Sequence, residues 1–279
     1  MERAAWLSAL IMVLMPFTLS HPAAAIPFLR TRLVPSALVI GCMAPDFEYF
    51  MRFSPGGKFG HTLPGVFIFD LPVAFITLWL FHAFAKEPLY AWLPESVRRR
   101  IRLGPPALEI KNLAQLGLVL LSILTGVATH IVWDSFTHKS LWPYQHWQFL
   151  HRMIFVPVIG PMECRRVIQH ASTVFGAVVL LLWFRGWYRR TAPNPPATEP
   201  RPRKNERGAL YASCFTALFA SGVRGVVIPL LAEPHLTALG KDQFECAVIT
   251  AISVFSLGVA AYGVVRARMR NGAQNAQAG

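Results

Sequence analysis

The sequence predicts an all-α fold: a polytopic bundle of membrane helices, with about five spanning helices and a short half-depth helix near the N-terminus. Of the 279 residues, 54% are hydrophobic and only 15% are charged, a balance more apolar than that of a typical soluble domain. The apolar residues gather into runs of about 20 residues, the length that a helix needs to cross the hydrocarbon core. These runs cover residues 63–85, 113–133, 167–187, 209–231 and 245–267.

Other architectures fit these runs less well. None of the runs alternates between polar and apolar residues with period two, which argues against a membrane barrel. A soluble core can bury an apolar helix, but five such runs in one chain favour a membrane.

The chain before the first spanning run contains two shorter elements. Residues 1–14 have a short basic start and an apolar stretch, so they form either a signal-like helix or an extension upstream of a true start at Met15. Ser20 is placed to cap a helix whose first position is Pro22. The apolar run 33–44 is too short to span, and we expect it to form the half-depth helix.

The distribution of basic residues predicts an orientation. Arginine and lysine gather between the first and second runs, between the third and fourth runs, and after the last run, whereas the stretches 135–166 and 232–244 are less basic. By the positive-inside rule, the basic connections and the C-terminus face the cytoplasm, and the protein is a multi-pass component of the plasma (inner) membrane. A basic patch at 200–207 could bind nucleic acid, but a cytoplasmic linker is the simpler interpretation, so we expect no nucleic-acid partner.

The chain therefore divides into five parts. We expect residues 1–14 to be the extension or signal-like helix, and residues 15–190 to be a membrane domain that carries the functional site. A linker rich in proline and arginine, 191–208, leads to a C-terminal pair of membrane helices, 209–270. Residues 271–279 are expected to form a disordered tail.

The most informative motif closes the second run: His130-Ile-Val-Trp-Asp134-Ser-Phe-Thr-His138. Residues four apart share a helix face, so one metal ion could bind His130 and Asp134, and a second could bind Asp134 and His138. In a continuous helix His130 and His138 lie about 12 Å apart along the axis, too far to share an ion without a kink. The spacing thus favours a carboxylate that bridges two ions. On this motif alone, hydrogen-bonded structural groups are an equally good interpretation.

Further ionisable residues favour the metal site. The predicted topology places His61, His138 and His170 at the outer membrane boundary, and Asp46 can reach the same level. His21, in the N-terminal segment, is a further candidate ligand. Ionisable groups at membrane depth are costly and usually face a functional interior. Imidazole and carboxylate groups suit zinc, the expected divalent metal.

Carboxylates near these ligands are candidates for other roles. Asp46 or Glu48 could act as a general base if it is not used as a ligand. Asp70, about two turns into the first span, could orient a ligand histidine or could make a polar contact between helices.

Four motifs, in this order, resemble an uncharacterised bacterial integral membrane family, domain of unknown function 4184. They are Met15-Pro-Phe-Thr-Leu-Ser-His21-Pro, Ala-Pro-Asp46-Phe-Glu-Tyr-Phe, Gly-His61-Thr-Leu-Pro-Gly and Thr-His130-Ile-Val-Trp-Asp134-Ser-Phe-Thr-His138, and the resemblance covers 15–190. More distantly, the order of these residues is similar to membrane-bound metal-dependent hydrolases and to the zinc-dependent phospholipase C and single-strand nuclease superfamily.

The distant resemblance implies a cluster of zinc ions in an all-helical fold. It implies that one zinc is held by Asp46, His61, His130 and Asp134, that Asp134 bridges to a second ion beside His21, and that His138 and His170 bind a third. The chain departs from that pattern after His170, where Val174 stands in place of the glutamate of a His-xxx-Glu pair. A dinuclear or mononuclear site is therefore the expectation.

The leading functional hypothesis is a membrane-embedded metal-dependent hydrolase that acts on a phosphoester. The location of the site at the outer lipid interface suggests a lipid or lipid-linked substrate and the bilayer as a partner. One alternative is a non-catalytic membrane protein in which the metal only ties helices together. Another is an ion or proton transporter. Many transporters are built from internal repeats, and this chain has no evident repeat, which argues against that alternative.

Overall fold

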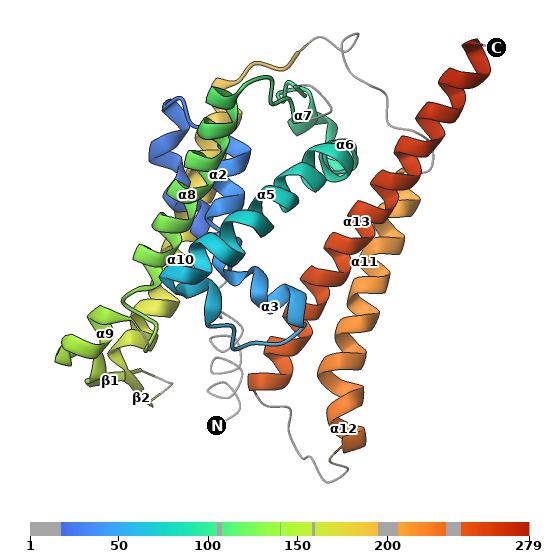
Figure 1. Cartoon of the computed structure of the whole chain (residues 1–279). Helices are drawn as coiled ribbons and strands as arrows, with labels where there is room; N and C mark the ends of the chain where they lie inside the picture. The colour runs from blue at the N-terminus through green and yellow to red at the C-terminus, as the bar shows by residue number, and fades with distance from the viewer. Residues whose placement is uncertain are drawn as a thin grey trace. The chain divides into compact units, whose positions relative to one another are not determined.

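The computed structural model describes residues 18–104, 108–139, 141–157, 160–194, 206–232 and 241–278 (Figure 1). The described chain is mostly helical, and its only strands form one short hairpin, which confirms the prediction of an all-α fold. Five helical stretches are long and apolar enough to cross a membrane: Leu63–Trp92, Leu113–Asp134, Cys164–Arg190, Glu206–Ala232 and Gln243–Arg270. The five predicted spans are therefore confirmed, each extended by a few residues at its ends.

The chain forms two compact units, each with its own internal packing. The first comprises the described residues of Met1–Glu48, Gly57–Phe75 and Asn112–Phe184, and the second those of Tyr49–Gly56, Ile76–Lys111 and Arg185–Gly279. All the predicted site residues belong to the first unit.

The first unit contains two long helices, several short helical turns and the hairpin. Its helical elements are η1 (Thr18–Arg30), α2 (Pro35–Gly41), η2 (Ala44–Asp46), η3 (Phe59–His61), α4 (Leu63–Gly65), η4 (Val66–Asp70), the start of α5 (Leu71–Leu80), α8 (Leu113–Asp134), α9 (Trp142–His146), η6 (Gln148–His151) and α10 (Cys164–Arg190). Strands β1 (Met153–Val156) and β2 (Gly160–Glu163) pair antiparallel, with Met153 opposite Glu163 and Val156 opposite Gly160.

The N-terminal segment differs from the helix predicted to start at Pro22. It forms the 3₁₀ helix η1 from Thr18, with Pro22 and Pro27 inside it. Proline lacks the N–H that a continuous α-helix needs, so two prolines within 13 residues favour this irregular form. The following α2, with seven residues, is too short to span, as predicted for the half-depth helix.

Helix α2 lies directly against α8 (Figure 1). Glycines make this contact possible: a Cβ on Gly41 would overlap the carbonyl of Ile123, and a Cβ on Gly126 would overlap that of Leu38. Small residues allow membrane helices to approach backbone to backbone. The N–H of Val34 also donates to Ser122 Oγ of α8, at 2.9 Å. This packing fixes the C-terminal end of α2 beside the last turns of α8.

The first span begins with a defined cap and an irregular turn. Thr62 Oγ1 accepts from the N–H of Gly65 at 3.1 Å and donates to the carbonyl of Phe59 at 2.7 Å. The turn η4, Val66–Asp70, is a π-helix, a form that often marks functional sites because it shifts the register of the residues around it. It places Asp70 in the interior of the unit, fully buried.

The second unit pairs the last two spans. It contains most of α3 (Phe47–Arg52), the end of α5, η5 (Phe81–Ala85), α6 (Lys86–Trp92), α7 (Glu95–Arg98), α11 (Glu206–Gly222), η8 (Val223–Val227), α12 (Ile228–Ala232) and α13 (Lys241–Ala278). Helices α11 and α13 lie side by side (Figure 1). Arg266 of α13 forms ion pairs with the buried Glu206 of α11 and with Glu87 of α6.

Three predicted segments can be compared with these bounds. Residues 1–14 and most of the predicted linker, 195–205, lie outside the described residues. The helix α11 begins at Glu206, inside the range 191–208 assigned to the linker. The helix α13 continues to Ala278, through the residues expected to form a disordered tail.

Candidate metal centre

The last turns of α8 supply two of the candidate ligands. His130 and Asp134, one turn apart, are both buried and both face the same side of the helix. His130 Nδ1 lies 2.8 Å from the carbonyl oxygen of Cys42, just after α2. Because a carbonyl only accepts, Nδ1 must carry the proton, and Nε2 of a neutral ring presents its lone pair to the interior. The glycine contact between α2 and α8 thus sets the ring orientation of His130.

Two short turns supply the other two candidates. Asp46 ends η2, which follows α2, and His61 ends η3, which precedes the first span. Both residues are buried. The turns pack closely, since a Cβ on Gly60 would lie 2.6 Å from the carbonyl oxygen of Pro45. The glycine before His61 therefore allows the two ligand-bearing turns to meet.

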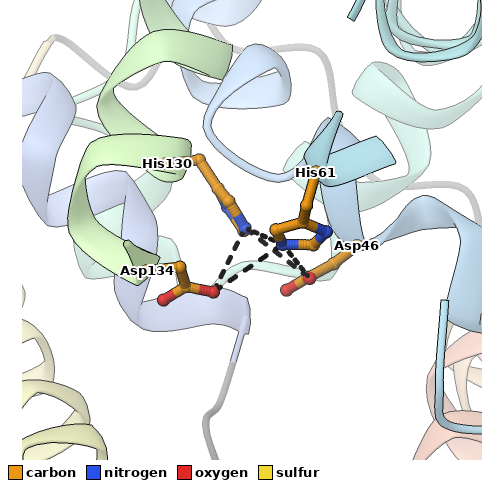
Figure 2. Close-up of side chains that lie close together, drawn as sticks. All are labelled: Asp46, His61, His130 and Asp134. Carbon is orange, nitrogen blue, oxygen red and sulfur yellow. Dashed lines mark hydrogen bonds and ion pairs between the residues drawn. The ribbon is translucent and has the colours of Figure 1, made fainter. Parts of the chain in front are cut away.

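Ligand atoms of these four residues converge on one point (Figure 2). One ligand atom from each of Asp46, His61, His130 and Asp134 lies within 4.8 Å of all the others. His130 Nε2 is 3.2 Å from His61 Nε2, 3.6 Å from Asp46 Oδ1 and 3.5 Å from Asp134 Oδ2. His61 Nε2 is 3.7 Å from Asp46 Oδ1 and 3.8 Å from Asp134 Oδ2.

These distances fit a single tetrahedral ion. Nitrogen and oxygen ligands at about 2.0–2.2 Å from zinc lie about 3.3–3.6 Å from one another in a regular tetrahedron. The five distances that involve a histidine span 3.2–3.8 Å, close to that geometry, and all four ligand atoms lie within 4.8 Å of one another. Two imidazoles and two carboxylates form a donor set that suits zinc or a similar divalent ion. The four residues could hold a metal ion, as the sequence predicts.

Two more histidines surround Asp134. His21 Nε2 lies 3.2 Å from Asp134 Oδ1, and His138 Nδ1 lies 3.5 Å from Asp134 Oδ2. Both ring nitrogens of His21 are buried and have no hydrogen-bond partner among the described residues. The two carboxylate oxygens therefore face different histidines, and the ring nitrogens of His21 are among the buried polar atoms that no hydrogen bond of the described residues satisfies.

The position of His138 depends on where α8 ends. Helix α8 ends at Asp134, and the chain turns over the next residues. The His138 ring consequently stacks on His61, with centroids 4.6 Å apart. His130 and His138 therefore approach the same carboxylate oxygen, Asp134 Oδ2, instead of lying at opposite ends of an extended helical face.

Burial keeps the outlying histidines neutral. Desolvation and the neighbouring His130 lower the pKa of His21 to about 4, against the opposing attraction of Asp134. Desolvation also lowers the pKa of His138. Both rings are thus uncharged at neutral pH, the form in which an imidazole binds a metal.

The other residues predicted for the site are not among the four converging ligands. His170 is half-buried on α10 and is not one of the four residues that converge within 4.8 Å. Glu48 Oε2 accepts from the N–H of Phe59 at 3.0 Å, so Glu48 supports the turn that carries His61. Asp70 is fully buried, and neither of its carboxylate oxygens has a hydrogen-bond partner among the described residues.

The residues that support the ligands were not foreseen as functional. The carbonyl of Cys42 and the glycines at 41, 60 and 126 position the ligands through the backbone. A backbone carbonyl gives no signal in a sequence. The Gly-His pair at 60–61 does give one, because a glycine beside a ligand indicates a close backbone approach.

Comparison with known proteins agrees with the sequence motifs. The sequence profile of the family described as Domain of unknown function (DUF4184) matches residues 15–264. The chain belongs to this family. The match confirms the resemblance and extends it beyond 190 into the C-terminal pair of helices. Searches among curated proteins and among solved structures gave no match.

Proposed function

We propose that this member of the DUF4184 family is a membrane-embedded, zinc-dependent hydrolase of a phosphoester in a lipid or lipid-linked substrate. The observation that carries the proposal is the surplus of ligands. Four buried side chains suffice for one ion, yet His21 and His138 also face Asp134, and apart from the ion-pair contact of Nε2 with Asp134 the buried ring nitrogens of His21 have no polar partner among the described residues. A second, incompletely coordinated ion between His21 and Asp134 Oδ1 would explain that arrangement.

Each residue has a role in this proposal. Asp46, His61, His130 and one oxygen of Asp134 would hold the first ion, and the other oxygen of Asp134 faces His21. Bound zinc would supply Lewis acidity and lower the pKa of water toward neutrality. Glu48 remains the candidate general base, because Asp46 is used as a ligand.

The location of the site supports a lipid substrate. His130 and Asp134 close the second span, and His61 directly precedes the first, so the centre lies at the ends of membrane helices. The side chain of His138 is 25% exposed and marks the accessible side of an otherwise buried cluster. The distribution of basic residues favours the outer face of the plasma membrane for this end.

A closed structural site is the second candidate, and one observation favours it. The four converging residues alone complete a tetrahedron, which is typical of structural zinc. The two functions differ at His21, which a structural site does not need. His21→Ala should leave one ion per chain and abolish hydrolysis if the centre is catalytic.

The first experiment measures metal content in detergent-purified protein. We expect one or more zinc ions per chain in the wild type, and loss of zinc in Asp134→Asn and His130→Ala. His146→Ala is the matched control, because His146 is exposed and its Nδ1 lies 2.9 Å from the carbonyl of Trp142, away from the cluster. A wild-type chain that stays metal-free after zinc is added back would refute the proposal.

The second experiment tests the reaction. Zinc-loaded wild type is assayed on phosphoester substrates in water and on phospholipids in bilayers, beside His21→Ala and Glu48→Gln. Hydrolysis by the wild type and its loss in both variants, with zinc at the first site retained, supports the proposal. A zinc-loaded wild type that hydrolyses none of these substrates favours the structural site.

A further inference from the structure

The connection between α8 and α10 exposes an unusual number of large apolar side chains. We define the aromatic connection as residues 141–157 and 160–163, which comprise α9, η6 and the β1–β2 hairpin. Its exposed side chains include Phe155, which is 76% exposed, and five others: Trp142, Trp147, Phe149, Met153 and Ile154. Three of these rings lie in a row, with centroids 6.2 Å apart for Trp142 and Trp147 and 5.9 Å apart for Trp147 and Phe149.

This pattern does not fit a surface that faces water. A strand with one solvated face alternates apolar and polar residues, whereas Met153, Ile154 and Phe155 are consecutive, apolar and all exposed. A two-stranded hairpin is also marginally stable in water by itself. Contiguous exposed apolar surface of this kind indicates a partner or a membrane.

The neighbouring elements identify what covers the aromatic connection. It joins the end of one candidate span, Asp134, to the start of another, Cys164, so it lies where these two helices leave the hydrocarbon core. Tryptophan is enriched at that boundary because its ring is apolar and its N–H is polar. Three exposed basic residues of the stretch 135–166, Lys139, Arg152 and Arg166, suit the phosphates of lipid headgroups.

The aromatic connection is tied to the turn that carries His138. Arg165 pairs with Glu163 of β2 at 2.7 Å, and its Nη1 donates to the carbonyl of Thr137 at 3.4 Å. Its guanidinium also lies over the ring of Tyr144, 5.5 Å from the centroid. The depth of this segment in the membrane therefore sets the depth of the metal centre.

We propose that the aromatic connection is a membrane-surface element, embedded among the lipid headgroups of the leaflet at which α8 ends. It holds the metal centre at the level of the phosphates. This placement does not depend on hydrolysis and holds equally if the metal centre is structural.

The test measures depth with a fluorescent label in nanodiscs that contain anionic phospholipid. Single labelled cysteines replace Phe155, or Ile154 as a second probe, in a chain whose four native cysteines are replaced by serine or alanine. Leu121→Cys, on the lipid-exposed side of α8, is the deep reference, and Glu109→Cys, which is exposed outside the spans, is the aqueous reference. Quenchers are lipids with a spin label high or low on the acyl chain, and aqueous iodide.

We expect the label at Phe155 to be quenched several-fold more by the shallow lipid quencher than by the deep one, and to be protected from iodide relative to Glu109. Iodide quenching equal to that at Glu109 would overturn the proposal. Quenching mainly by the deep lipid, as at Leu121, would also overturn it.

A second inference comes from unsatisfied polar atoms beside His61. His61 Nε2 faces the other ligands, whereas His61 Nδ1 is buried without a hydrogen-bond partner among the described residues. Both carboxylate oxygens of Asp70 are also buried without a hydrogen-bond partner among the described residues. Asp70 Oδ1 packs against Gly60, the residue before His61, since a Cβ there would lie 2.9 Å from it. A buried carboxylate thus lies beside the residue that precedes His61, and both this carboxylate and His61 Nδ1 lack a hydrogen-bond partner among the described residues.

We propose that Asp70 is a positioning residue that accepts a hydrogen bond from His61 Nδ1 when a metal binds Nε2. Ligand histidines usually donate their second N–H to a carboxylate or carbonyl, as His130 does to Cys42. Metal binding would give His61 a defined tautomer and draw the two groups together. This inference rests on the metal site and not on hydrolysis.

The test compares metal affinity with the stability of the metal-free protein. Asp70→Leu should weaken the binding of Co²⁺ by about 10–100-fold, and Asp70→Asn, which keeps an acceptor oxygen, should weaken it less. The metal-free variants should unfold at the same temperature as the wild type or higher, because a buried carboxylate without a partner is removed. Unchanged affinity in Asp70→Leu, or affinity loss together with a lower unfolding temperature of the metal-free protein, would overturn the inference.

Discussion

Substitution of Gly126 by alanine tests how the fold orients the metal centre. A Cβ at this position would overlap the carbonyl of Leu38 and lie 2.7 Å from the backbone nitrogen of Cys42. Helix α2 must therefore move away from α8. That movement draws the Cys42 carbonyl away from His130 Nδ1, which now lies 2.8 Å from it.

The size of the effect follows from these contacts. Overpacking of a close contact costs about 1–3 kcal/mol, and weakening one buried hydrogen bond adds about 1 kcal/mol. We therefore expect the free energy of unfolding to fall by about 2–4 kcal/mol. Loss of the group that orients a ligand histidine weakens metal binding by about 10–100-fold.

The same helix offers a matched control for this substitution. Gly117 also lies in α8, but a Cβ there would meet nothing within 4 Å. Gly117→Ala should leave metal affinity unchanged and stability unchanged or slightly higher. Thermal unfolding in detergent and zinc competition with a chelator measure both quantities. If Gly126→Ala behaves as Gly117→Ala does, the backbone contact does not orient His130 and the reasoning is wrong.

Three further predictions concern charge. Asp134→Asn removes the carboxylate that faces His21 and His138, so zinc affinity measured by chelator competition should fall by at least about 100-fold, equivalent to about 3 kcal/mol. The pKa of His21 is lowered to about 4, so the metal-free folded chain binds fewer protons than the unfolded chain between pH 4 and 6.5. The contribution of His21 to the free energy of unfolding should therefore be fully present above about pH 6.5 and fall by up to about 3 kcal/mol as the pH drops toward 4. A pH series of unfolding temperatures measures this fall, which should be smaller in His21→Gln. Arg266→Ala leaves the buried Glu206 without its partner and should destabilise the protein by about 3–5 kcal/mol, whereas Glu206→Gln in the same chain should restore part of the loss without changing zinc content.

The membrane fold could be predicted because it depends on composition and length. Each span is a long apolar run. Because lipid offers no hydrogen-bond partner to the backbone, such a run must form a helix, in which every backbone N–H and C=O is paired internally. The hairpin at 153–163 was not predicted, because its strands are four residues each and carry no alternating pattern. The π-helical turns in the first span also could not be predicted, because they do not change the hydropathy of the sequence.

The candidate site could be predicted in part. The spacing of His130 and Asp134 placed both on one helix face, and the topology brought Asp46 and His61 to the same level. The spacing argument treated α8 as continuous to His138, whereas the helix ends at Asp134 and His138 follows in a turn, 3.5 Å from Asp134 Oδ2. Which of His21, His138 and His170 bind an ion stays a prediction, because it depends on distances of a few tenths of an ångström that no sequence pattern encodes.

The order of the ligands along the chain has a consequence for biogenesis. The four converging residues all precede the third span, so every one of them is synthesised before α10, α11 or α13. The packing of α2 on α8, which orients His130, belongs to the same early segment. A nascent chain arrested after α8 therefore already carries all four candidate ligands, although the C-terminal pair of helices has not yet been made.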